Sequence, residues 1–110
     1  MTKQQPPPTP SHLSRRAREF WRRVSRAYVL EPQQLELLRR CCEQLDRADL
    51  AGALIRLQGL TTLDRFGQPR ANPAVSVERQ ASLALSRLLR ELNLDVAPPD
   101  ARPSTLAYGG

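Results

Sequence analysis

An arginine-rich stretch near the start of the chain is the strongest candidate for chemistry in the sequence. Residues 15–26 contain six arginines and only one glutamate; the arginines are Arg15, Arg16, Arg18, Arg22, Arg23 and Arg26. The guanidinium group can donate two parallel hydrogen bonds to a phosphate or to guanine, so the cluster predicts binding to DNA. At helical spacing these side chains share one face, opposite an apolar one. The same pattern is also typical of a helix that is only soluble, or that pairs with acidic groups of a protein partner.

The net charge of the chain is concentrated in the same stretch. The formal charge of the whole sequence is +6. Residues 1–30 contain seven basic side chains and one acidic one, whereas basic and acidic side chains nearly cancel in residues 31–60 and 61–110. A polyanion would therefore be attracted to the first helix rather than to the later parts of the chain.

Side chains suited to catalysis or metal binding form no recognisable motif. His12 is the single histidine, and Cys41 and Cys42 are neighbours in a helical pattern, where they do not form a normal disulfide. Nucleophile-elbow and phosphate-loop motifs are absent from the sequence. Asp46 and Asp49 are more typical of a charged helix surface than of a nuclease site. We therefore expect no catalytic residue, no metal site, no cofactor and no enzymatic activity.

Three helices are predicted to position the arginines. Apolar residues recur at helical spacing from Leu13 to Tyr28, from Glu31 to Gln58 and from Asn72 to Asn93. The second helix is long for a small domain, and Gly52 marks a point where it could bend.

A short β-hairpin is predicted between the second and third helices. Gly59 fits a helix C-cap, and Asn72 fits an N-cap followed by proline. Between these caps, Leu60–Leu63 and Gln68–Ala71 are expected to form two strands joined by a turn. The predicted fold class is thus mainly α, with three helices, a hairpin between the second and third, and flexible proline-rich tails.

The chain is predicted to form one small domain. Residues 1–12 are expected to be a disordered arm, residues 13–94 the helical oligomerisation and DNA-binding domain, and residues 95–110 a proline-rich tail. So small a domain gains stability when subunits share a core, so we expect an oligomer. Large apolar side chains are the expected interface, although the tryptophan among them is better suited to a core position: Phe20, Trp21, Tyr28, Leu38, Leu45, Leu54 and Leu57. No apolar run is long enough to span a membrane and no signal peptide is recognisable, which predicts a cytosolic protein.

In their order and spacing, these features resemble the small terminase subunit of tailed double-stranded DNA bacteriophages, over roughly residues 14–95. The residues that carry the resemblance are Phe20–Val24, Cys42–Ala48, the hairpin from Gly59 to Gly67, the helix start at Asn72–Ala74 and Arg87–Leu94.

The resemblance implies a DNA-packaging factor without enzymatic activity, acting in the host cell cytoplasm. Such a protein binds viral DNA at the packaging start site as an oligomeric ring and recruits or regulates the large terminase subunit, which holds the ATPase and the nuclease. The implied partners are double-stranded viral DNA, the large subunit and further copies of the chain, and no membrane. We assign the large-subunit contact to the tail that begins at Asp95.

Two other interpretations remain open. The chain could be a non-enzymatic protein-interaction adaptor whose basic helix docks on an acidic partner. It could also be a small transcription regulator with the third helix in the major groove. Against this last interpretation, Arg87 and Arg90 lie near the end of that helix, whereas recognition helices usually read bases from their N-terminal half.

Overall fold

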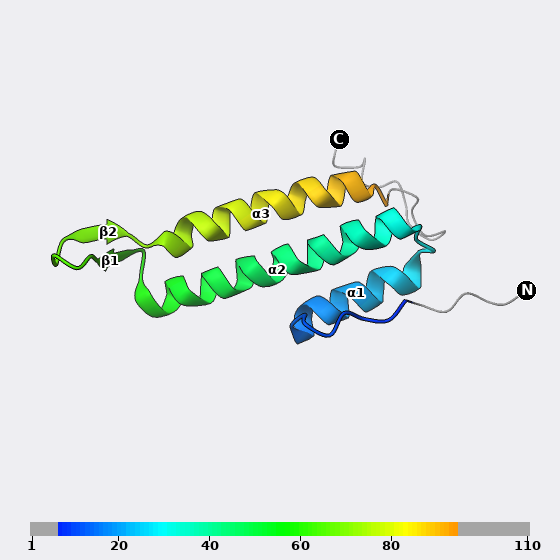
Figure 1. Ribbon diagram of the computed structural model, residues 1–110, viewed down its shortest axis with the longest axis horizontal. Helices are drawn as coiled ribbons and strands as arrows, with labels where there is room; N and C mark the ends of the chain where they lie inside the picture. The colour runs from blue at the N-terminus through cyan, green and yellow to red at the C-terminus, as the bar shows by residue number, and fades with distance from the viewer. Residues whose placement is uncertain (1–6, 95–110) are drawn as a thin grey trace, which may run out of the picture.

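The computed structural model describes residues 7–94 of the chain as three helices and one hairpin (Figure 1). The helices are α1 (Arg15–Ala27), α2 (Pro32–Gln58) and α3 (Pro73–Leu92), and the strands are β1 (Thr61–Leu63) and β2 (Pro69–Ala71). The two long helices, α2 and α3, lie side by side and antiparallel, and the hairpin projects from the end where they are joined (Figure 1). The shorter α1 lies beside the half of α2 that begins at Pro32 (Figure 1). For these residues the predicted fold class, three helices with a hairpin between the second and third, is confirmed.

Side chains at the helix ends explain where each helix begins and stops. The Ser14 hydroxyl caps α1 by accepting a hydrogen bond from the Ala17 N–H at 3.1 Å. A capping box starts α2, with the Gln34 side chain accepting from the Glu31 N–H at 2.8 Å. The last cap, Asn93, adopts the left-handed conformation with φ 52°, so three of the predicted helix boundaries lie at the expected residues or next to them.

Gly52, where the sequence indicated that α2 could bend, does not interrupt the helix. The helix runs without interruption for 27 residues, and Gly52 is buried inside it. A Cβ atom at this position would lie 3.1 Å from the Glu78 carboxylate of α3. The glycine therefore permits close approach of α3.

Asn72 fixes the junction between the hairpin and α3. Its side-chain oxygen accepts from the Ala74 N–H at 3.0 Å, and its side-chain nitrogen donates to the Gly59 carbonyl at 2.8 Å. The residue is buried, and its own N–H donates to the Leu60 carbonyl at 2.8 Å. One side chain thus caps α3 and also ties its first turn to the end of α2.

The core lies where all three helices meet. Its buried members are Leu13, Ala17, Trp21, Val24, Leu38, Cys41, Cys42 and Leu92. Burial raises the pKa of the Cys41 thiol to about 11, and burial with the neighbouring Cys41 raises the pKa of the Cys42 thiol to about 12. Both thiols are free, so they act as small apolar core groups, as the sequence predicted.

The N-terminal segment contacts the rest of the protein through its last two residues, His12 and Leu13. Residues 7–13 contain no helix or strand and run beside α1 (Figure 1). Leu13 is buried, and His12 Nε2 lies 2.8 Å from Glu43 Oε2. The rest of the predicted arm, residues 1–6, and the predicted tail at 95–110 lie outside the described residues.

Replacing Asn72 by alanine is expected to lower the free energy of unfolding by about 1–2 kcal/mol, because α3 loses its N-cap and the Gly59 carbonyl loses its donor. Urea unfolding followed by circular dichroism measures the change. The matched control is Gln80→Ala, at an exposed position of α3, which should stay within about 0.5 kcal/mol of the parent. Equal stability of both variants would contradict the structural role of Asn72.

Candidate nucleic-acid interface

Asp46 of α2 holds the start of α1 in place. One carboxylate oxygen accepts from the Ser14 N–H at 2.8 Å, and the other accepts from the Ser14 hydroxyl at 2.5 Å. Since Ala17 and Trp21 are buried against α2, this attachment turns the opposite side of α1 outward. The arginine-rich side predicted from the sequence therefore faces solvent.

Arg16 differs from the other arginines because it is paired. Its Nη1 atom donates to both oxygens of Asp49 at 2.8 Å. Both side chains are partly exposed, so the pair adds little to stability, roughly 0–1 kcal/mol. Its main consequence is that the Arg16 charge is already balanced and is less available to a phosphate.

The remaining arginines of α1 have no carboxylate partner within residues 7–94. Arg15, Arg23 and Arg26 are exposed, while Arg18 and Arg22 are half-buried. Together with Arg16 they are the six predicted DNA-binding residues, and the structure brings all of them onto one helix. Five guanidinium groups remain free to bind an anion.

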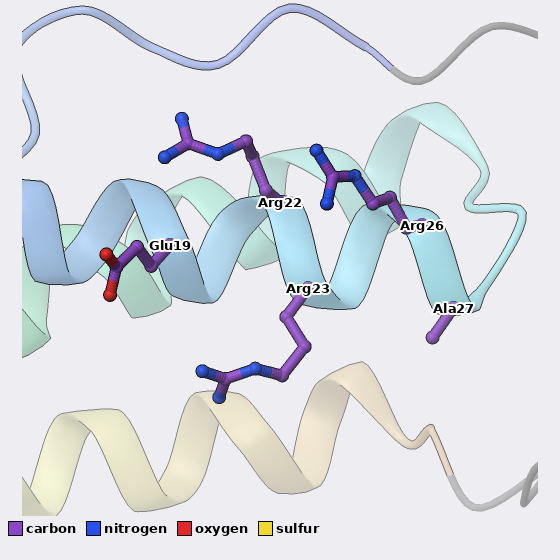
Figure 2. A pocket seen from close by; sticks show the side chains of 5 residues that line it. All are labelled: Glu19, Arg22, Arg23, Arg26 and Ala27. Atoms are coloured by element: carbon purple, nitrogen blue, oxygen red, sulfur yellow. The ribbon is translucent and has the colours of Figure 1, made fainter.

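The arginines project from α1 in two directions. In Figure 2, Arg22 and Arg26 leave the helix on the side of the N-terminal segment, and Arg23 leaves it on the side of α3. Glu19, the single acidic residue of α1, lies with them around an open hollow of about 430 Å³. A DNA strand that runs along α1 could place its phosphates against Arg22 and Arg26, against Arg23, or against both sets.

Arg23 also borders a crevice between α1 and α3. The crevice has a volume of about 350 Å³, and its apolar lining comes from Phe20, Leu45, Leu85 and Leu89. Arg23 is exposed at the surface beside these apolar groups, and Arg16 and Glu19 line the crevice together with it.

The residues predicted for a subunit interface lie in different environments. Trp21 and Leu38 are buried in the core of the protomer itself and offer no surface to a second subunit in this arrangement. Phe20, Tyr28 and Leu45 are partly buried against the same core. Leu54 and Leu57 are exposed, at 39% and 80%. The exposed members of the predicted interface set thus lie on the part of α2 beyond α1.

Sequence reasoning missed the partners of α1 and a groove on α2 and α3. Asp46 and Asp49 are more than thirty residues from Ser14 and Arg16, and no local pattern connects such distant positions. The groove has a volume of about 370 Å³ and joins the far half of α2 to the start of α3. Leu54 of α2 and Val77 of α3 both line it, and no local pattern connects these two positions.

Within residues 7–94, no helix is both long and apolar enough to cross a membrane. The same part of the chain contains no group of three or more histidine, cysteine, aspartate or glutamate side chains placed to hold a metal ion.

A model of the phage terminase small subunit family matches residues 17–102 of the chain. The match begins in α1 and includes α2, the hairpin and α3, so it spans well over half of the sequence. No curated protein and no solved structure matches the chain.

Replacing Asp46 by alanine is expected to loosen the start of α1 and to lower the free energy of unfolding by about 1–2 kcal/mol, because two hydrogen bonds to a carboxylate are lost. Amide hydrogen exchange at Ala17 and Arg18 should become faster. The matched control is Asp49→Ala, which breaks only an exposed ion pair and should cost less than about 1 kcal/mol. Unchanged exchange in the Asp46 variant would contradict its role in holding α1.

Proposed function

Because the chain belongs to the phage terminase small subunit family, we propose that it binds viral DNA through the arginines of α1, assembles as a ring and recruits the large terminase subunit. Membership of the family places the protein in phage DNA packaging. In the proposed role the chain has no catalytic step of its own. It marks the packaging start site on the DNA, in the host cell cytoplasm, and delivers that DNA to the subunit that performs the chemistry.

The observation that supports DNA binding is the set of free guanidinium groups on α1. Arg15, Arg18, Arg22 and Arg26 follow one another at steps of three or four residues, which places them along one side of the helix. At 1.5 Å per residue this row is about 16 Å long, enough to follow several phosphates of one strand. Charge on an exposed helix supports contacts to the DNA backbone, and these contacts set affinity and salt dependence rather than sequence preference.

The observation that supports assembly is the apolar surface on the far half of α2. Leu50, Leu54 and Leu57 lie at helical spacing on one side of α2, and all three are exposed. Exposed apolar groups gathered in one place are typical of protein interfaces. We assign the ring contact to this half of the molecule, and the large-subunit contact to residues 95–110, which lie outside the described residues.

Replacing Arg22, Arg23 and Arg26 by alanine is expected to weaken DNA binding and to flatten its salt dependence, because each lost phosphate contact reduces the slope of log K against log salt by about 0.9. Fluorescence anisotropy with a duplex, measured at several salt concentrations, determines both quantities. The control removes the same number of charges from the exposed side of α3, with Arg79, Arg87 and Arg90 replaced by alanine. If both triple variants lose the same affinity and slope, DNA responds only to net charge and the assignment to α1 fails.

Light scattering at micromolar concentration is expected to give a mass several times the 12.4 kDa of one chain. The midpoint of thermal unfolding should rise with protein concentration, because assembly stabilises only the folded subunit. A mass of one chain across this range would exclude the ring and leave the DNA contact to be judged separately.

A further inference from the structure

The hairpin presents an apolar face to solvent. In its register Thr61 pairs with Ala71 and Leu63 pairs with Pro69, so these four side chains share one face. All four residues are exposed, Leu63 by 70%. A two-stranded hairpin is at best marginally stable in water on its own, because it has no second layer to cover its apolar side. No element in the described part of the chain covers this face.

The opposite face and the turn are polar and well ordered by hydrogen bonds. The Asp64 carboxylate accepts from the N–H groups of Phe66 and Gln68, at 2.8 and 2.9 Å, and Arg70 Nε lies 3.4 Å from the same carboxylate. This turn holds Phe66 at the tip, 74% exposed, with the Arg65 guanidinium 5.1 Å from its ring centroid. The apolar groups of the hairpin are therefore displayed by a defined structure.

A groove of matching character lies at the foot of the hairpin. Its volume is about 370 Å³, and the apolar residues that line it are Leu50, Ala51, Leu54, Pro73, Ala74 and Val77. A cavity of roughly 150 Å³ admits a benzene ring, so the groove has room for two large side chains. Its positions on α2, including Ala51 and Leu54, lie on a different side of the helix from Cys42 and Asp46, which contact α1. The groove is thus left open by α1.

The hairpin cannot fill the groove of its own chain. Only Gly59 and Leu60 separate α2 from β1, and only Asn72 separates β2 from α3. Asn72 is held at both ends of its side chain, and the strands run away from the helices (Figure 1). With connections this short, the hairpin cannot fold back by about 180° onto α2 and α3, as it would have to do to enter the groove of its own chain.

We propose that the hairpin of one copy packs into the α2–α3 groove of the next copy, with Leu63 and Phe66 as the inserted groups. This inference rests on the ring of the proposed function and specifies its contact. The occupant is a second copy because this chain leaves both apolar surfaces, one projecting and one hollowed, without a partner in residues 7–94. A contact between two different surfaces of identical chains is heterologous, and such contacts build a ring when the rotation between neighbouring copies closes.

Mixing two defective variants tests the inference directly. Leu63→Glu places a charge on the hairpin, and Val77→Glu places one in the groove; both positions tolerate a charge in the monomer because they are 70% and 39% exposed. Each variant alone is expected to be monomeric by light scattering. An equimolar mixture is expected to form dimers and nothing larger, because one intact hairpin then meets one intact groove and no further contact is possible.

The control is Leu83→Glu, which adds the same charge at a 59% exposed position of α3 outside the groove and should assemble like the wild type. The inference is overturned if either defective variant assembles fully, or if the mixture stays monomeric or forms full-size assemblies. With a wild type that assembles, these results overturn the hairpin contact alone. A monomeric wild type overturns the contact together with the proposed ring.

Discussion

The difference in length between α1 and α2 is the constraint on which the rest of the structure depends. α2 has 27 residues and α1 has 13, so α1 can cover only about half of the length of α2. Where α1 is present, Trp21 and Leu38 are buried and the core closes within one chain. Beyond α1, the apolar side chains of α2 remain at the surface, Leu57 most of all. An apolar helix face needs a second layer. α3 runs along α2 (Figure 1), but α1 covers another side of α2 along only half of its length.

The same attachment that closes the core also decides where the positive charge points. α1 is strongly amphipathic, so docking Ala17 and Trp21 on α2 forces the arginines outward. Asp46 fixes the N-cap residue of this helix, Ser14, while Asp49 neutralises one of the six arginines. These two carboxylates on α2 therefore have different effects: Asp46 sets the position of α1, and Asp49 reduces the free positive charge on α1. The binding surface is a consequence of core packing rather than an addition to it.

Much of the fold could be predicted because its signals are local. Glycine and asparagine mark helix ends by their own backbone and side-chain chemistry, so Gly59 and Asn72 were recognisable without tertiary information. Contacts between distant segments leave no such signal. The pairing of Arg16 with Asp49 and the close approach of α3 at Gly52 depend on how the helices pack. The arginine cluster was predictable because it is local in the sequence. The division of its side chains between two sides of α1 was not, because those sides are defined by the segments packed around the helix.

Separating the cationic surface from the apolar one has a physical advantage for the proposed ring. The arginines lie over the half of α2 that α1 covers, and the groove and hairpin lie at the other end, so assembly through the far half leaves the arginines exposed. Each subunit then offers only a few phosphate contacts, which bind weakly at physiological salt. In a ring these weak contacts act together, since the first subunit to bind raises the effective concentration of DNA for its neighbours. Affinity would thus be a property of the assembly, and a free subunit would bind DNA too weakly to commit it to packaging.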